Sequence, residues 1–300
     1  MELRQLASLV AIADGGSFSR AAINLNLAQP SLSRQMALLE KELGQRLLVR
    51  TGRGVELTAA GEVFIVHARE MLDTARRGRD AMHDLGQEPA GRVTVGMPPR
   101  VALGLSVPLV RSFRERFPRA VITVLEGLSL ALRESLVAGR LDLALMFDPQ
   151  PSPQLSYEPL MREQLLLVAP PRSHLPARVS LASLSNYPMV LPSAPNAIRG
   201  LLDDILGPRG VSLNVLAEVG AVQTVLALVA EGAGCTVLPE SALAARPGGE
   251  RLPHAPLGPP AIRNTLVLAT PLARPGTRLT RETAQLLRSL DFRKGLPSNQ

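Results

Sequence analysis

The sequence has no tryptophan and only two tyrosines, and aromatic residues make up 3% of its 300 positions. Its single cysteine, Cys235, cannot form an internal disulfide, so we expect a reducing, cytoplasmic setting. Only two of the 33 basic residues are lysines. We attribute this arginine excess to coding bias, because alanine, glycine and proline are abundant too.

Long apolar runs are also missing. No run of 18 consecutive apolar residues occurs, which predicts that no segment spans a membrane and that no membrane is a partner. Residues 1–12 are amphipathic rather than a basic stretch before an apolar core, so we expect no signal peptide. With 46% hydrophobic residues, the chain still has ample material for buried cores, and its length favours more than one domain.

Catalytic, cofactor and metal motifs are absent from the sequence as well. The four histidines are scattered, and none lies near a cysteine or an acid at the spacing of a metal site. No nucleophile elbow, phosphate-binding loop or dinucleotide fingerprint occurs. The sequence therefore predicts a protein that is not an enzyme and that uses neither a cofactor nor a metal.

The net charge of +7 is a weak signal for DNA binding because of where the charges lie. Residues 1–92 contain 12 basic and 11 acidic residues, so most of the positive surplus lies further along the chain. A local feature is more informative. No acidic residue occurs between Asp14 and Glu40, and an acid-free surface can approach a phosphate backbone without repulsion.

Residues 17–34, SFSRAAINLNLAQPSLSR, lie within this acid-free stretch and predict two short helices joined by a tight turn. Apolar residues recur at helical spacing in both, Ser17 is a suitable N-cap, and Pro30 suits the first turn of the second helix. Glutamine and arginine on the polar face of the second helix can recognise base edges. We expect a helix-turn-helix whose second helix enters a major groove. An ordinary helical hairpin is the alternative.

The next segment predicts a β-hairpin followed by a long helix. Two short extended pieces flank residues 51–54, TGRG, and present Arg50 and Arg53, which suits a wing that touches DNA; a solvated basic hairpin is the alternative. A helix from Thr58 to about Leu85 carries a heptad seam that favours dimer contact over packing within one chain. The residues that we assign to dimerisation are Phe64, Ala68, Met71, Ala75, Met82 and Leu85.

From Arg92 onward, strand-like and helix-like stretches alternate, which predicts an α/β fold with largely parallel sheets in two small lobes. The expected strands are residues 92–97, 121–126, 142–147, 164–169, 188–192, 213–218, 235–239 and 265–270. The expected helices are residues 101–116, 129–139, 196–207, 221–231 and 277–290. Ligands of such folds bind beyond the carboxyl ends of strands.

Three motifs carry a family resemblance: LRQLASLVAIADGGSFSRAA, AQPSLSRQMALLEKELGQRLLVRTGRGVELTAAGE and EGAGCTVLPESAL. With them the chain resembles a LysR-type transcriptional regulator over essentially its whole length, and PSLSRQ and LPSAPNAIR look closest to the nitrogen assimilation control branch. The resemblance implies a winged helix-turn-helix (1–58), a linker helix (59–90) and a two-lobed, periplasmic-binding-protein-like α/β effector domain (91–300). Lobe I would comprise residues 92–165 and 267–300, and lobe II residues 166–266.

The resemblance also implies partners. They are double-stranded DNA, a small polar or acidic effector, and further copies of the chain in a homodimer and commonly a homotetramer; contact with RNA polymerase is also open. By position, DNA contacts would be made by Gln29, Pro30, Ser31, Ser33, Arg34, Arg50 and Arg53. Many relatives have serine where this chain has Ala28, and losing a capping hydroxyl there costs on the order of 1 kcal/mol.

The effector cleft that the resemblance implies would be lined by Pro99, Arg100, Ser129, Phe147, Ser193, Asn196, Gln223 and Thr224. Two prolines replace amide donors in the first loop, so an anion pocket is weakened unless Arg100 turns inward; Arg100 facing solvent is the alternative. Two other interpretations of the whole chain remain open. One is a constitutive regulator of the same family with a vestigial cleft, and the other is a solute-binding or enzymatic α/β protein with a helical appendage.

Overall fold

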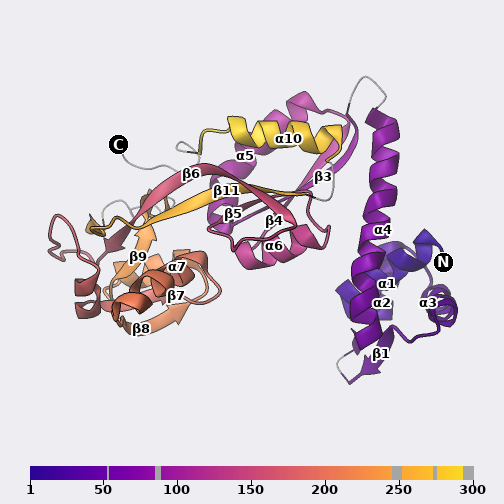
Figure 1. Ribbon diagram of the computed structural model, residues 1–300, viewed down its shortest axis with the longest axis horizontal. Helices are drawn as coiled ribbons and strands as arrows, with labels where there is room; N and C mark the ends of the chain where they lie inside the picture. Colours follow the sequence, from indigo (N-terminus) through magenta and orange to yellow (C-terminus); the bar gives the residue numbers. More distant parts are fainter. Residues whose placement is uncertain (53, 85–88, 245–251, 273–275, 293–300) are drawn as a thin grey trace. The chain divides into compact units, whose positions relative to one another are not determined.

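The computed structural model describes residues 1–52, 54–84, 89–244, 252–272 and 276–292. The chain divides into two compact units near residue 87 (Figure 1), and each is described by itself. No helix in the described ranges is both long enough and apolar enough to cross a bilayer.

The N-terminal unit is a helical core with a small hairpin. Its elements are α1 (Leu3–Gly15), α2 (Phe18–Leu25), α3 (Gln29–Leu43), β1 (Leu48–Thr51), β2 (Gly54–Leu57) and α4 (Ala59–Asp84). Helix α1 packs against α2, α3 and α4. The apolar stripes predicted from helical spacing are buried together: Leu6, Leu9, Ile12, Ala21, Ala22, Leu32, Met36 and Leu39.

The ends of these helices follow the sequence signals with one exception. Asn26 ends α2 in a left-handed conformation with φ 52°, and Pro30 lies in the first turn of α3, as predicted. Thr58 accepts a hydrogen bond from the Gly61 amide (3.0 Å) and so caps α4. Ser17 occupies the N-cap position of α2, but its side chain makes no capping hydrogen bond, so that expectation was wrong in its chemistry. Ala28 is the N-cap of α3 and offers no side-chain acceptor.

The predicted wing is present, and the rest of the unit holds it in place. Strands β1 and β2 pair antiparallel, from Leu48 opposite Leu57 to Thr51 opposite Gly54. The Val55 amide donates to the Gly16 carbonyl (2.9 Å), which ties β2 to the α1–α2 turn. Gly54 has φ +135°, and a Cβ there would lie 2.5 Å from the same carbonyl oxygen, so only glycine fits this close approach.

The first part of the heptad seam on α4 does not face outward as expected. Ala68 has an exposed fraction of 0% and lies in the core of the unit with α1, so it cannot contact a second chain. Phe64 and Met71 are half-buried against the same core. The period of apolar residues identifies a buried face of a helix, but a core in the same chain can cover that face as well as a partner can. Leu85, at the end of the seam, lies outside the described residues.

The C-terminal unit is built on a sheet with the order β10-β6-β11-β5-β3-β4, in which β9 also pairs with β6. The strands are β3 (Gly91–Met97), β4 (Ala120–Glu126), β5 (Leu143–Phe147), β6 (Leu155–Val168), β9 (Thr236–Pro239), β10 (His254–Pro256) and β11 (Arg263–Pro271). Strands β7 (Pro188–Pro192) and β8 (Asn214–Val219) form a separate parallel pair. The helices are α5 (Pro99–Arg116), α6 (Ser129–Val137), α7 (Ala197–Leu206), α8 (Val222–Ala230), α9 (Glu240–Ala244) and α10 (Arg278–Ser289).

Two lobes share this sheet, each with its own core. In the first lobe, alternate residues of β5 point to opposite faces: Leu143 and Leu145 pack with α5 and α10, whereas Ala144 and Met146 pack with α6. In the second lobe, the end of β6 packs with β9, α7 and α8. Strands β6 and β11 run through both lobes and link them (Figure 1).

The expectation of largely parallel sheets was right for part of the unit. Strands β3, β4 and β5 are parallel to one another where they pair, as are β7 and β8. Strand β11 pairs antiparallel with both β5 and β6, and β9 and β10 pair antiparallel with β6. This difference arises because β6 carries the chain from the first lobe to the second and β11 carries it back, and strands that leave and return side by side run antiparallel.

Candidate functional site

The exposed face of α3 is the first candidate site. Gln29, Pro30, Ser31 and Arg34 are exposed at the start of this helix, and Ser33 is half-buried. The Ser19 hydroxyl on α2 donates to Gln29 Oε1 (3.2 Å), which holds the side chain against the preceding helix. The amide N–H groups of Gln29 remain available as donors, so the helix begins with two side chains, Gln29 and Arg34, that can recognise base edges.

The acids that flank this stretch are engaged in structural contacts. Glu40 accepts hydrogen bonds from the amides of Leu47 (2.8 Å) and Leu48 (3.2 Å), and so fixes the start of the wing. Asp14 pairs with Arg69 on α4 (2.6 Å). Their charges are therefore partly neutralised, and the start of α3 stays free of repulsion toward phosphates.

Of the two arginines predicted to contact DNA from the wing, the structure describes Arg50, which lies close to α2. Its guanidinium carbon is 5.8 Å from the centroid of the Phe18 ring, within the range of a cation–π contact. Arg50 remains exposed. Arg53, the other predicted wing contact, lies outside the described residues.

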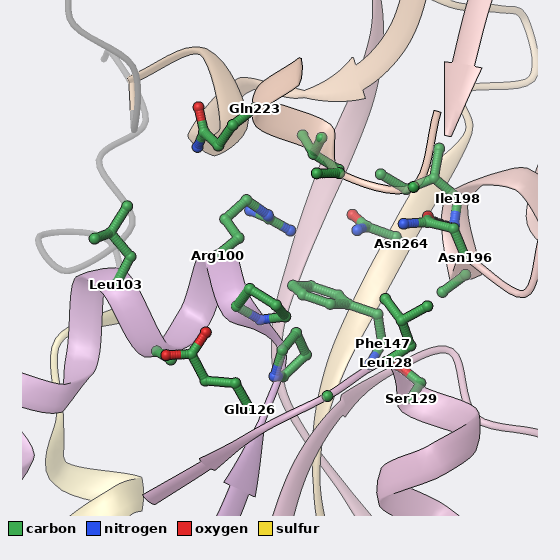
Figure 2. Close-up of a pocket in the computed structure, with 18 of the residues that line it drawn as sticks. Arg100, Leu103, Glu126, Leu128, Ser129, Phe147, Asn196, Ile198, Gln223 and Asn264 are labelled. Atoms are coloured by element: carbon green, nitrogen blue, oxygen red, sulfur yellow. Dashed lines mark hydrogen bonds between the residues drawn. The ribbon is translucent and has the colours of Figure 1, made fainter. Parts of the chain in front are cut away.

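The second candidate site is a cavity of about 780 Å³ in the C-terminal unit (Figure 2). The N-terminal ends of α5, α6, α7 and α8 meet at it, together with the end of β5 and the start of β11. Six predicted effector contacts line it: Pro99, Arg100, Ser129, Phe147, Asn196 and Gln223. The cavity therefore brings together predicted contacts that are up to 124 positions apart in the sequence, from Pro99 to Gln223.

Two predicted effector contacts, Ser193 and Thr224, do not line the cavity. Ser193 follows β7, and its amide donates to the Val219 carbonyl (3.0 Å). Helix α8 begins at Val222, and consecutive residues of a helix point about 100° apart. Gln223 therefore reaches the cavity while Thr224 is directed elsewhere and is exposed.

Arg100 turns inward, but it already has a partner there. Its side chain is only 9% exposed, and Nη1 lies 3.0 Å from Oε2 of Glu163, whose side chain is 8% exposed. The same nitrogen donates to the Ser241 hydroxyl, and the guanidinium carbon lies 4.6 Å from the centroid of the Phe147 ring. Burial lowers the pKa of Arg100, and the charge of Glu163 opposes that shift. The sequence alternatives were inward or solvent-facing, and neither included a buried counter-ion.

Ser129 and Asn196 each use one polar atom to organise the cavity. Ser129 Oγ accepts from the Phe147 amide (3.0 Å), and Asn196 Oδ1 accepts from the Ile198 amide (2.9 Å) at the start of α7. The Ser129 O–H and the Asn196 side-chain N–H groups can still donate to a ligand.

Asn264 is the most informative cavity residue that the sequence did not identify. It is 1% exposed at the start of β11, it lines the cavity, and neither Nδ2 nor Oδ1 has a hydrogen-bond partner among the described residues. An unsatisfied buried polar group costs about 1–3 kcal/mol, so such an amide needs an explanation. The available signal is a polar amide directly before the apolar run TLVLAT, and the expected strand, residues 265–270, begins after it.

Other reactive groups lie apart from the cavity lining. Cys235 is 6% exposed, and burial raises the pKa of its thiol, which disfavours the reactive thiolate. Within the ranges that the structure describes, no three histidine, cysteine or acidic side chains are grouped closely enough to hold a metal ion.

Comparison with known proteins gives two family matches. Residues 3–62 match the model of the bacterial regulatory helix-turn-helix proteins of the lysR family, and residues 86–291 match the LysR substrate-binding domain. The nitrogen assimilation regulatory protein nac of Klebsiella aerogenes is 36% identical over 243 residues, 81% of this chain and 79% of that protein. The nac protein of Escherichia coli K12 is 37% identical over 244 residues, again 81% and 79%. Among solved structures, a full-length OxyR variant from Pseudomonas aeruginosa aligns with a TM-score of 0.75 and 23% identity over 96% of this chain and 93% of its own.

Proposed function

Since the chain belongs to the LysR family of bacterial transcriptional regulators, we propose that it binds duplex DNA with α3 in the major groove and the wing beside it. The observation that carries this assignment is the exposed, acid-free start of α3, with Gln29 held by Ser19 and Arg34 exposed five residues further on. Gln29 and Arg34 would recognise bases, while Pro30, Ser31, Ser33, Arg50 and Arg53 would contact the backbone. A regulator that binds DNA also belongs in the cytoplasm, where RNA polymerase is a further partner.

A mobility-shift titration tests this assignment. The specific duplex is first selected by binding from a random-sequence pool. Gln29→Ala or Arg34→Ala should cost about 1–3 kcal/mol on that duplex and far less on random DNA, because a base contact is lost. Arg50→Ala should weaken binding to both and lower the salt slope by about 1, because a phosphate contact is lost.

Arg4→Ala is the matched control, since Arg4 is exposed on α1 and outside the proposed surface. It removes the same charge and should leave the preference for the selected duplex unchanged. Equal losses on selected and random DNA for Gln29→Ala would contradict the assignment of that side chain to base recognition.

We assign self-association to α4, on a surface that differs from the predicted seam. Val63 and Val66 are 67% and 47% exposed, one turn apart, and lie on the side of α4 away from the core-facing Ala68. Met82, which belongs to the predicted seam, is also exposed further along the helix, but on another side of it than Val63 and Val66. Apolar residues exposed on one helix favour association with another apolar surface, and a dimer would place two copies of α3 on DNA.

The cavity between the lobes is the proposed effector site. Its volume of about 780 Å³ and its few polar groups among apolar walls are typical of sites for small molecules, and favour a working cleft over a vestigial one. Because β6 and β11 run through both lobes, a ligand that contacts both lobes can favour one relative orientation of them over another. The test is whether a compound that raises the melting temperature of the full chain also changes its mobility-shift curve.

A further inference from the structure

We propose that the ligand of this cavity is a neutral molecule with a hydrogen-bond donor and acceptor side by side, such as a carboxamide, and that Asn264 pairs with both. This inference rests on the proposed function of the cavity as an effector site, and it adds the chemical class of the effector. A carboxylate, which a site at several helix N-termini would otherwise favour, is excluded as the main ligand group by the charges around the cavity.

Asn264 is placed to form hydrogen bonds with a ligand in the cavity. Its side chain is buried and lines the cavity, and both polar atoms are unpartnered among the described residues. Figure 2 shows Asn264, Arg100 and Phe147 directed toward the same central space. A primary amide offers N–H donors on one side and a carbonyl acceptor on the other, so its best partner is another amide edge, which satisfies both with two parallel hydrogen bonds.

The charges around the cavity disfavour an acidic ligand. Of the described residues that line the cavity, Arg100 is the one cation, and its charge is matched by Glu163 at 3.0 Å. Asn264 lies directly opposite Glu163 in the β6–β11 ladder, so the carboxylate is adjacent to the amide. A carboxylate ligand would have to share Arg100 with a buried carboxylate or displace it, and either change leaves a buried negative charge poorly compensated.

The helix N-termini do not reverse this conclusion. Pro98 is the N-cap of α5 and Pro99 its first residue, so neither supplies an amide donor. At α7, Asn196 already accepts from the Ile198 amide. Another acid, Glu126, lies on the cavity lining and adds negative charge. The donors that usually favour an anion at helix N-termini are therefore fewer here.

The walls suit an apolar body on the ligand. Phe147, Leu128, Ile198 and Val222 line the cavity, and one face of the Phe147 ring is covered by the Arg100 guanidinium. Burying apolar surface of the ligand stabilises the complex, whereas the hydrogen bonds to Asn264 mainly fix orientation. A ring that carries a carboxamide combines both features.

Matched pairs of neutral and acidic probes test the proposal on the full chain. Isothermal titration calorimetry would compare nicotinamide with nicotinate and benzamide with benzoate, since each pair has the same ring and nearly the same shape. The amides should bind at least about tenfold more tightly than the acids, a difference of about 1.4 kcal/mol. Asn264→Leu should lose that preference by weakening amide binding about tenfold. Asn214→Leu is the control, because Asn214 is exposed on β8 and does not line the cavity.

A second variant keeps the proposal testable if Asn264→Leu fails to fold. Glu163→Gln removes the counter-ion of Arg100 and should allow nicotinate to bind, while nicotinamide binding changes little. Acids that bind the natural chain as tightly as the amides would overturn the ligand class but leave the effector site in place. Amide binding that is unchanged in Asn264→Leu would also refute it, as would no binding by any of the four probes. The DNA-binding assignment is tested separately by the mobility shift.

Discussion

The buried Arg100–Glu163 pair makes a stability prediction that can be worked from its geometry. Both side chains are less than one-tenth exposed, and their charged atoms are 3.0 Å apart. Removing one partner of a buried pair costs about 3–5 kcal/mol, because the other charge is left without compensation. Glu163→Gln keeps a hydrogen-bond acceptor for Nη1 of Arg100, and the Phe147 ring still covers the guanidinium. We therefore expect a loss of unfolding free energy at the lower end of this range, about 3 kcal/mol.

Calorimetry of the full chain measures this cost. A change of 1 kcal/mol shifts the melting temperature of a domain of 150–250 residues by roughly 2–4 °C, so the C-terminal unit should melt roughly 6–12 °C lower in Glu163→Gln. The transition of the N-terminal unit should not move, because the pair lies within the other unit. Because the chain has two compact units, the calorimetric curve is fitted with two unfolding transitions rather than one.

The control for this prediction replaces both charges. The double variant Arg100→Met with Glu163→Met fills similar volume without a buried charge, and such replacements are often neutral or stabilising. It should melt close to the natural chain, and well above Glu163→Gln. If Glu163→Gln shifts the transition by less than about 2 °C, corresponding to less than about 1 kcal/mol, the pair is solvated and the argument for a charge-neutral cavity fails.

Three further predictions concern other parts of the chain. Val66→Asp should shift the full chain toward monomer in analytical ultracentrifugation without lowering its helix content, because the substituted side chain is exposed on α4; a mutant that remains dimeric contradicts the interface. Gly54→Ala should destabilise the N-terminal unit by roughly 1–3 kcal/mol in urea unfolding, because φ is +135° and the added Cβ meets the Gly16 carbonyl; an unchanged midpoint would show that the wing moves freely. Burial raises the pKa of Asp148, and the hydrogen bond from the Thr265 amide opposes that shift, so stability is lost as pH rises from the ordinary carboxyl range through the raised value. Asp148→Asn keeps the acceptor and should remove this pH dependence when urea unfolding is measured at several pH values; a variant with the same pH profile as the natural chain would refute this cause.

The sequence predicted the helix-turn-helix, the wing and most strands correctly because local chemistry specifies them. Apolar residues at helical spacing, Pro30 near a helix start and glycines between two short strands all act within a few positions. The first half of β6 was missed for a related reason. Residues 155–163, LSYEPLMRE, contain a proline and several exposed polar residues, so they lack the apolar run by which the other strands were recognised.

Assignments that depend on distant parts of the chain were less successful. The seam on α4 showed which residues are apolar, but not that α1 covers Ala68. The same limit applies to the effector contacts. Six of eight line the cavity, since helix starts can be located from sequence. The directions of Ser193 and Thr224 depend on where β7 ends and where α8 begins, to within one residue, and spacing does not determine this.

The charge preference of the cavity shows most clearly why the lining residues alone are insufficient. Sequence reasoning reduced the question to whether Arg100 points inward, and an inward arginine would then have implied an acidic effector. The guanidinium does point inward, yet Glu163, 63 positions further along and behind the lining, accepts its hydrogen bond. A buried cation attracts an anionic ligand only to the extent that the protein has not already neutralised it. The polar group that remains unsatisfied, Asn264, is uncharged, and its unpaired donor and acceptor therefore determine the ligand chemistry that this cavity can stabilise.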